Sequence, residues 1–305
     1  MSHPPSLTIA ITGANSGIGL RAARQLAARG HRILALCRDP HRGRAAVETI
    51  STDAAQPATL IVTDLSDPAS VDAAADRILD ETGHLDVLIN NAAVFDQTIR
   101  TPAYTASGHE LFWATNHLGP FRLTARLSPL LAAAPHPRLI NVASKGLITM
   151  PRIAIRFDQL DDPGWYSPTK AYYHAKLAQI MTAYALALRA RGTLDVACVR
   201  VPAVRLDTDR LAALPWALRA LYAPKNRLAT PAERLGEAYA ALATRTGTWQ
   251  DHADPASPGR AALRGVYLDE RLRPVDAPAF AYDAQARERL WALSQAATGD
   301  PAWAW

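Results

Sequence analysis

The stretch AITGANSGIGL, residues 10–20, joins an apolar run to a helical pattern through a turn with three glycines, Gly13, Gly17 and Gly19. Glycine lets the backbone turn tightly and approach a bound group closely, because it has no Cβ. The first turn of a helix offers free N–H groups and the positive end of the helix dipole. A strand, a glycine-rich loop and a helix in this order are typical of a fold that binds the phosphates of a dinucleotide.

Short apolar runs alternate with longer helical patterns along the first two thirds of the chain. The runs are nearly continuous in apolar residues, as expected for strands buried on both faces, and they cover residues 7–12, 32–37, 59–63, 86–90, 138–143 and 194–201. Helices are expected at 18–30, 40–51, 67–82, 107–132 and 166–191. Such alternation predicts right-handed crossovers and an α/β fold with a Rossmann-like, doubly wound parallel sheet.

The last third of the chain departs from this alternation. Residues 203–262 contain several prolines, an amphipathic piece LAALPWALRALYAP and a polar loop TWQDHADPASPGR. A short strand at 265–268 and a helix that ends at Gly299 follow. We therefore expect one domain, residues 1–305, in which 203–262 form a helical substrate-binding cover over one end of the sheet and 263–305 form a C-terminal strand and helix.

Composition excludes several classes of protein. With 49% hydrophobic and 20% charged residues, the 305-residue chain can bury a large core and is not disordered. The net charge of +5 is spread along the chain, which argues against nucleic-acid binding. Cys37 and Cys198 lie in apolar runs, which favours reduced thiols in a cytoplasmic protein, and no metal site is expected. No signal peptide and no integral membrane span are expected either.

Two tyrosines precede a lysine in AYYHAKLAQ, residues 171–179. On a helix, Tyr172 and Lys176 are i,i+4 neighbours, and Tyr173 and Lys176 are i,i+3 neighbours. A phenol with a pKa of about 10 is a poor acid at neutral pH, and an ammonium one turn away lowers that pKa. The spacing brings both phenols near the ammonium and leaves the choice between them open.

Further motifs follow in order, and together they resemble those of the short-chain dehydrogenase/reductase superfamily. The matching segments are T-G-x-x-x-G-x-G at 12–19, TDL at 63–65, NNAA at 90–93, ELFWATNHLGPFRLT at 110–124, INVAS at 140–144 and Y-x-x-x-K at 172–176. The C-terminal segment is similar to that of retinol-dehydrogenase-like and WW-domain-oxidoreductase-like members. The resemblance covers nearly the whole chain.

The resemblance implies an oxidoreductase, and possible roles for its catalytic residues. In the family, the cofactor carries a hydride to or from a carbonyl carbon, and the protein supplies a proton to the developing alkoxide. Tyr172 would be the acid, Lys176 would lower its pKa and reach the nicotinamide ribose, and Ser144 would bind the carbonyl oxygen. Asn116 would hold a water that relays protons through Lys176. Tyr173 points about 100° further round the helix and is expected to pack against a neighbouring element.

The end of the second apolar run bears on the choice of cofactor. A carboxylate there usually binds the ribose 2′-OH of NAD, whereas a guanidinium can bind the 2′-phosphate of NADP. Arg38 and Asp39 occupy this place in ALCRDP, and CRD resembles NADP-preferring relatives. NADP(H) is favoured, with reduction as the working direction, and NAD(H) is the alternative. The expected cofactor-binding residues are Gly13, Asn15, Ser16, Gly17, Ile18, Gly19, Arg38, Asp64, Leu65, Asn91, Ala92, Tyr172, Lys176, Pro202 and Thr208.

Some positions depart from the family pattern. Ala93 replaces the glycine of N-N-A-G, Ala203 replaces that of the Pro-Gly after the sixth run, and His174-Ala175 fill the spacer before the lysine. Alanine resists positive φ, so the loop 202–208 is expected to leave its usual path. Two other functions therefore stay open. One is a non-redox enzyme such as an epimerase, cyclase or dehydratase, and the other is a cofactor-sensing binding protein, which the intact catalytic residues argue against.

Substrate choice is expected to depend on residues 146–168 and 203–230, with Leu147, Ile148, Met150, Trp165, Trp216, Leu221 and Tyr222 as apolar lining. Such a pocket suits a hydrophobic or polycyclic carbonyl compound. The piece at 211–224 is expected to be a lid rather than a membrane-surface helix, because Pro215 interrupts it and its basic residues are few. Relatives use the apolar part of 166–191 for dimer contacts, so a monomer and a homodimer are both open.

Overall fold

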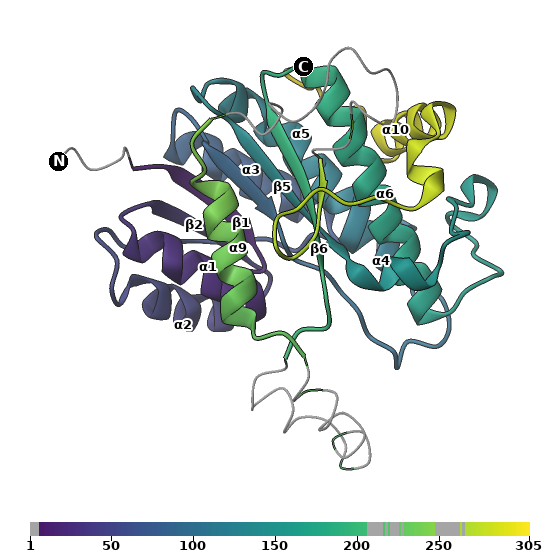
Figure 1. The fold of residues 1–305 in the computed structure, drawn as a ribbon, viewed down its shortest axis with the longest axis horizontal. Helices are drawn as coiled ribbons and strands as arrows, with labels where there is room; N and C mark the ends of the chain where they lie inside the picture. Colours follow the sequence, from purple (N-terminus) through teal and green to yellow (C-terminus); the bar gives the residue numbers. More distant parts are fainter. Residues whose placement is uncertain are drawn as a thin grey trace.

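The computed structural model describes residues 6–205, 229–247 and 266–305, with Trp216, Arg219, Asn226 and Leu263. Its centre is a seven-stranded sheet in the order β3-β2-β1-β4-β5-β6-β7, in which all neighbouring strands are parallel (Figure 1). The order reverses between β1 and β4, and ligands of open α/β sheets bind beside such a switch point. The predicted α/β fold with a doubly wound parallel sheet is confirmed.

The elements follow the expected order with small shifts at their ends. The strands are β1 (Thr8–Thr12), β2 (Arg32–Cys37), β3 (Thr59–Val62), β4 (Val87–Asn90), β5 (Arg138–Ser144), β6 (Asp195–Val201) and β7 (Tyr267–Leu268). The longer helices are α1 (Gly17–Ala28), α2 (Pro40–Ser51), α3 (Pro68–Glu81), α5 (Gly119–Ala132), α6 (Pro168–Ala190), α9 (Ala232–Ala243) and α10 (Ala284–Ala297). The short ones are α4 (Leu111–Trp113), a π-helix η1 (Ala114–Leu118), and the 3₁₀ turns η2 (Lys145–Thr149), η3 (Phe157–Gln159) and η6 (Ala279–Tyr282).

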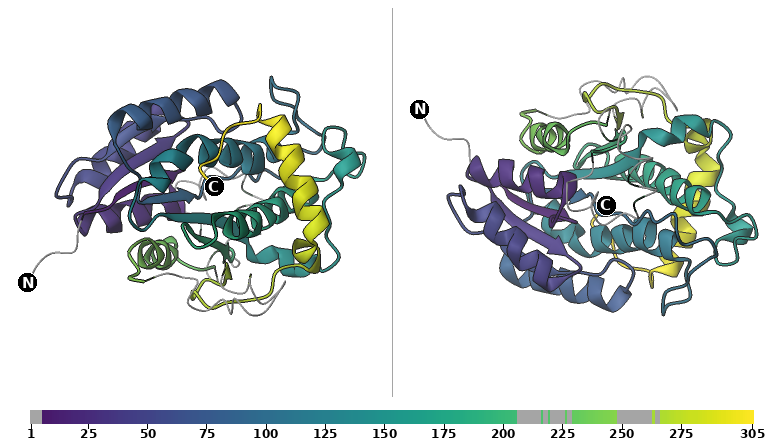
Figure 2. Two further views of the ribbon diagram at one scale, coloured as in Figure 1. Left: turned by 90° about the horizontal axis from the view of Figure 1, so that it is seen from above. Right: turned by 90° about the horizontal axis from the view of Figure 1, so that it is seen from below.

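Helices cover both faces of the sheet, and the views of Figure 2 place α9 and α10 on different sides of it. Successive strand residues alternate between the two cores. On β1, Ala10 packs in the core that contains α3, α5, α6 and α10, whereas Ile9 and Ile11 pack in the core that contains α1 and α9. Burial on both faces explains why the strand segments are almost continuously apolar.

Part of the expected cover has a different place. Helix α9 lies along α1 on one face of the sheet (Figure 1). The contact is close at Gly236, where an added Cβ would lie 2.9 Å from the backbone nitrogen of Ala22. The prediction that 203–262 cover one end of the sheet is therefore wrong for Ala232–Ala243. Most of the rest of that segment, with Leu221 and Tyr222, lies outside the described residues.

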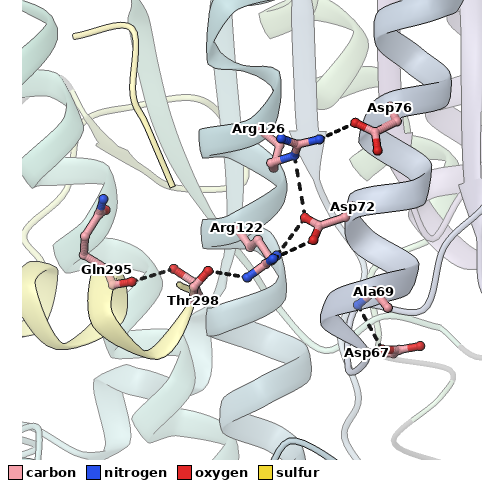
Figure 3. Close-up of polar contacts among 8 residues, drawn as sticks. All are labelled: Asp67, Ala69, Asp72, Asp76, Arg122, Arg126, Gln295 and Thr298. Carbon is pink, nitrogen blue, oxygen red and sulfur yellow. Dashed lines mark hydrogen bonds and ion pairs between the residues drawn. The ribbon is translucent and has the colours of Figure 1, made fainter. Parts of the chain in front are cut away.

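The C-terminal segment packs against α5, as Figure 3 shows at Arg122, and α10 also packs along α6, where Arg189 lies over the ring of Trp291. Arg122 of α5 forms a two-pronged ion pair with Asp72 of α3 and donates to the carbonyl of Thr298, just past the end of α10. The rings of Trp291 and Trp303 each lie 5.0 Å from the ring of Phe121. The segment thus covers part of the helical surface that the sequence suggested for dimer contacts.

In the part of the chain that the structure describes, no helix has the length and apolar character needed to span a bilayer. The same residues contain no group of three His, Cys, Asp or Glu side chains placed to bind a metal. Cys37 and Cys198 are buried free thiols, and burial raises the pKa of Cys37 to about 11 and that of Cys198 to about 12.

Candidate active site

A cleft of about 530 Å³ opens at the carboxyl ends of the strands, beside the switch point. It brings together most of the predicted cofactor-binding residues, namely Gly13, Asn15, Ser16, Gly17, Ile18, Arg38, Asp64, Leu65, Asn91, Ala92, Tyr172 and Lys176. Gly19, Asn116, Ser144 and Pro202 are not among its lining residues. Thr208 lies outside the described residues.

The glycine turn has the backbone that the sequence predicted. Gly13 and Gly17 have φ of +68° and +55°, which residues with a Cβ rarely adopt. Gly19 is needed for another reason, because an added Cβ would lie 2.5 Å from the carbonyl oxygen of Gly13 and 2.6 Å from Nδ2 of Asn91. The turn therefore aims the first N–H groups of α1, which have no partner within the helix, toward the cleft.

Thr12 fastens this turn to the loop after β4, a role that the sequence analysis missed. Its Oγ1 accepts hydrogen bonds from the backbone N–H groups of Asn91 and Ala92, each at 2.9 Å. Asn91 in turn donates from Nδ2 to the carbonyl of Thr12 at 2.9 Å. The threonine that precedes the first motif glycine was the available signal.

The two alanines at family glycine positions cause no backbone strain. Among the described non-glycine residues, only Arg191, Leu272 and Asp300 have a positive φ. After β6 the carbonyl of Ala203 accepts from Thr230 N–H at 3.0 Å, so the chain forms a regular bridge there. The described stretch ends at Arg205, so the expected diversion of the loop 202–208 stays a prediction.

Helix α6 carries Tyr172 and Lys176 into the cleft. The helix begins where Ser167 caps it and Pro168 occupies its first turn, a common start signal. The Tyr172 hydroxyl is hydrogen-bonded to Ser144, which ends β5. The Lys176 ammonium lies 5.7 Å from the centre of the Tyr172 ring. Ser144, Tyr172 and Lys176 are therefore brought together as the resemblance implied.

The pKa of Tyr172 differs from the one that the sequence predicted. Burial above all, and the neighbouring Tyr173, raise the pKa of Tyr172 to about 12, and the hydrogen bond with Ser144 only partly opposes them. Burial also lowers the pKa of Lys176 to about 8. The predicted fall in the pKa of Tyr172 is therefore absent in this structure, because desolvation of the phenol outweighs the nearby ammonium.

Lys176 is held by two acceptors, one of which the sequence analysis missed. Its Nζ donates to the carbonyl of Val142 at 2.7 Å and to Oε1 of Gln179 at 2.8 Å. Both contacts favour the charged ammonium, and neither brings a counter-ion. An ammonium has three donors, so one remains for another partner. The i,i+3 spacing of Lys176 and Gln179 was the available signal.

Asn116 is fully buried on the π-helix η1. Its Oδ1 accepts from the N–H of Val94 at 2.7 Å, and its Nδ2 donates to the carbonyl of Val94 at 2.9 Å. The side chain therefore holds the loop that forms one wall of the cleft. Single π-turns within helices are frequent at functional sites. The role of Asn116 in a proton relay stays a prediction.

Two cations lie where the adenosine ribose of a dinucleotide would reach. Arg38 was expected there, and Arg42, one helical turn further, also lines the cleft. Asp39 caps α2, since its Oδ1 accepts from the N–H groups of His41 and Arg42 at 2.8 and 3.1 Å. Both bonds lower the pKa of Asp39, and the bond from the N–H of Arg42 has the larger effect. The i,i+4 spacing in RDPHR would have indicated Arg42.

The apolar residues expected around the substrate are not all at this cleft. Phe95, which the sequence analysis missed, lies 4.5 Å from the Tyr172 ring and is 45% exposed. Ile148 is exposed and Leu147 is buried in the core. Met150 and Trp165 line a different cavity, so the structure does not bring these two residues to this cleft.

Comparison with known proteins gives relatives in sequence. Residues 7–154 match the model of a family described as short chain dehydrogenase. Retinol dehydrogenase 12 of Homo sapiens is 33% identical over 292 residues, which are 95% of this chain and 85% of that protein. Dehydrogenase/reductase SDR family member 13 of Bos taurus is 33% identical over 96% of this chain and 73% of its own length.

Solved structures share the fold. An uncharacterised protein from Mycobacterium paratuberculosis aligns with a TM-score of 0.65 at 29% identity, over 97% of this chain and 95% of that one. A short chain dehydrogenase from Shigella flexneri, complexed with NADP, aligns with a TM-score of 0.64 at 20% identity, over 88% and 98%. A xylitol dehydrogenase bound to NAD⁺ aligns with a TM-score of 0.63 at 18% identity, over 86% and 96%.

Proposed function

The chain belongs to the short-chain dehydrogenase/reductase superfamily, and from this premise we propose that it is an NADP(H)-dependent oxidoreductase that reduces the carbonyl group of a hydrophobic substrate. The observation that carries the cofactor choice is the pair Arg38 and Arg42 at one end of the cleft. Two guanidinium groups suit a 2′-phosphate, and the carboxylate of Asp39 already serves as a helix cap.

The residues of the cleft fit a dinucleotide. Gly17 has the positive φ that the turn requires, and an added Cβ there would meet no atom within 4 Å, so the turn is open toward the cleft. The pyrophosphate would lie against the first turn of α1, and the nicotinamide ribose would lie within reach of Lys176. When bound, the cofactor supplies the hydride.

The protein's own part is proton transfer and positioning. The hydroxyl of Ser144 would donate to the substrate's carbonyl oxygen and orient it. As negative charge develops on that oxygen, Tyr172 would transfer its phenolic proton to it. The ammonium of Lys176 would then stabilise the phenolate that remains. The high pKa of Tyr172 keeps its phenol protonated, which is the form that donates the proton at the start of this reaction.

The proposed substrate class rests on two observations. Phe95 leaves an exposed aromatic face beside the Tyr172 ring. The relatives whose full length this chain largely covers include a protein named as a retinol dehydrogenase. A long-chain or polycyclic aldehyde, ketone or alcohol would match such an apolar surface.

The proposal predicts NADPH oxidation with apolar carbonyl compounds. We expect kcat/KM for retinal, a long-chain aldehyde or a steroid ketone to exceed that for a short polar aldehyde by roughly 10- to 100-fold, because each added buried apolar group strengthens binding. Steady-state assays with this panel measure it. An equal rate for the short polar aldehyde would contradict the substrate class, and product formed without NADPH consumption would favour a non-redox enzyme.

The cofactor choice predicts the effect of removing the two arginines. Replacing Arg38 and Arg42 by serine should lower kcat/KM for NADPH by about 10²- to 10⁴-fold, since each of the two lost charge-assisted hydrogen bonds contributes about 1.5–3 kcal/mol, and should barely change that for NADH. Arg44→Ser, at an exposed position on the same helix, is the matched control. If the double variant loses activity equally with both cofactors, the arginines do not bind a 2′-phosphate.

A further inference from the structure

A second cavity, of about 520 Å³, lies between the loop at 150–156 and the start of α6. Its volume is within the roughly 300–1,000 Å³ typical of small-molecule pockets. It shares no lining residue with the cofactor cleft. On α6 it is lined by Lys170 and His174, which point about half a turn away from Tyr172. The cavity therefore lies behind the catalytic helix.

This basic cavity carries three cations, Arg152, Arg156 and Lys170, and no carboxylate among its lining residues. Within the described ranges, none of the three forms an ion pair with an acidic side chain. The guanidinium of Arg156 instead lies over the ring of Trp165, at 5.7 Å from its centre. Positive charge of one sign in a concave surface attracts an anion.

One buried donor on a residue that lines the same cavity has no acceptor. The indole N–H of Trp165 is buried and has no hydrogen-bond partner within the described residues. His174, beside it, is 5% exposed, and its Nε2 accepts from the N–H of Arg156 at 2.9 Å, so the ring proton is on Nδ1. Buried donors are normally satisfied, so the indole N–H is suited to an oxygen-bearing ligand.

The rest of the lining is apolar, with Met150, Pro151, Ile153, Ala154 and the ring of Trp165. We call these five residues the apolar wall. A ligand that fits both the wall and the three cations has an apolar body and one anionic end. An inorganic ion would use only the charges, and a neutral lipid would use only the wall.

A neighbouring cavity of about 590 Å³ makes a useful contrast. Its lining includes Arg156, which it shares with the basic cavity, and Arg289, which is paired with Asp158 at 2.7 Å. Its other carboxylate, Asp283, caps α10 by accepting from Ala286 N–H at 2.9 Å. Two carboxylates thus balance two cations there, whereas the basic cavity is lined by three cations and no carboxylate, which makes the basic cavity the place for an anionic ligand.

We propose that the basic cavity binds an amphipathic carboxylate, a medium-chain fatty acid or a compound of the same chemistry. The carboxylate lies among the three cations, and the alkyl chain lies along the apolar wall. Because this site is behind α6, its occupation leaves the cofactor cleft open, so the ligand and NADPH bind together. The proposal is independent of the reaction that the cleft performs.

Isothermal titration of the full chain with decanoate, in the presence of saturating NADPH, tests the proposal. We expect one decanoate per chain, at least tenfold weaker binding of decanol and of decyltrimethylammonium, and no comparable binding of inorganic phosphate. The double variant Arg152→Gln, Lys170→Gln should weaken decanoate binding by about tenfold or more, as expected for the loss of charge-assisted contacts. Both residues are exposed, so the fold should persist, and thermal unfolding checks this.

Arg289→Gln, in the neighbouring cavity, is the matched control and should leave decanoate affinity unchanged. The proposal is overturned if decanoate does not bind, if decanol binds equally well, or if phosphate alone binds as tightly. It is also overturned if the double variant binds decanoate like the parent, or if NADPH displaces decanoate, because either result would place the ligand in the cleft or elsewhere.

Discussion

Replacement of Tyr172 by phenylalanine is expected to lower kcat by about 10²–10⁴-fold, the usual contribution of a positioned general acid. The change removes only the hydroxyl that is hydrogen-bonded to Ser144. The ring stays against Phe95, at a centroid distance of 4.5 Å, so the cleft keeps its shape. Cofactor affinity should therefore change little. Turnover numbers with NADPH and a retinal-like aldehyde, together with a cofactor titration, measure both quantities.

Tyr173→Phe is the matched control, because the two tyrosines are adjacent on α6. The hydroxyl of Tyr173 lies against Gly146, at 1.9 Å from where a Cβ on that glycine would stand. It packs on the loop after β5, as the sequence analysis expected. This variant should retain most of the turnover. If Tyr173→Phe abolishes activity and Tyr172→Phe does not, the acid is Tyr173.

Acidification from pH 6.5 to pH 4.5 is expected to lower the free energy of unfolding by about 5 kcal/mol. The cause is a pair of buried histidines, His117 and His174, whose pKa values burial lowers from 6.5 to about 3 each. A loss of this size is comparable to the whole stability of many domains. We therefore expect the chain to unfold in mild acid, as measured by urea titrations at a series of pH values.

The surroundings of each buried ring explain why neither takes up a proton easily. The Ser294 hydroxyl donates to the carbonyl of Leu290 at 2.8 Å, so it accepts from Nε2 of His117, at 2.7 Å. A second proton on His117 would enter a site among aromatic rings. On His174, Nε2 already accepts the N–H of Arg156, and protonation would place two donors against each other.

The direction of the effect follows from where the protons go. Above pH 6.5 both states hold neutral histidines, and the free energy of unfolding does not depend on them. Between pH 6.5 and about 3 the unfolded chain binds protons that the native chain excludes, so stability falls by about 1.4 kcal/mol per pH unit for each histidine. The ion pair with Arg122 lowers the pKa of the Asp72 carboxyl, so its contribution to stability is lost mainly at a lower pH than that of the two histidines.

Glutamine variants separate these histidines from other titrating groups. His117→Gln keeps a donor for Ser294, and His174→Gln keeps an acceptor for Arg156. The double variant should lose at most about half as much stability as the parent between pH 6.5 and 4.5, whatever its stability at pH 7. His136→Gln, at an exposed position, is the control and should behave like the parent. Equal acid sensitivity in the double variant would show that the histidines are not responsible.

The fold could be predicted because its signals are local. Apolar runs and helical periods gave all strands within a residue or two, and the glycine spacing located the first turn. Helix α9 was missed as a layer against the sheet because the segment 203–262 that contains it is rich in prolines and suggested a loop-rich cover. Its contacts with α1, at Gly236 and between Glu233 and Arg21, reveal its place, and they join segments more than 200 residues apart in sequence.

The sequence predicted which residues form the candidate site better than it predicted their pKa values. Motif order identified Ser144, Tyr172 and Lys176, and the structure brings them together. The pKa of Tyr172 could not be read from spacing, because desolvation depends on everything that surrounds the phenol. For the same reason Gln179 and Arg42, whose roles depend on which way their helices face, were not singled out.

The amino-acid sequence by itself determined the alternating strands and helices and the glycine turn, and it indicated the candidate catalytic residues, since each of these signals is a short local motif. The tertiary structure decided what surrounds them: the aromatic face of Phe95 beside Tyr172, the carboxylate of Asp39 that caps α2, and the basic cavity behind α6. Burial and charge balance are sums over neighbours from distant segments, and only the folded chain brings those neighbours together.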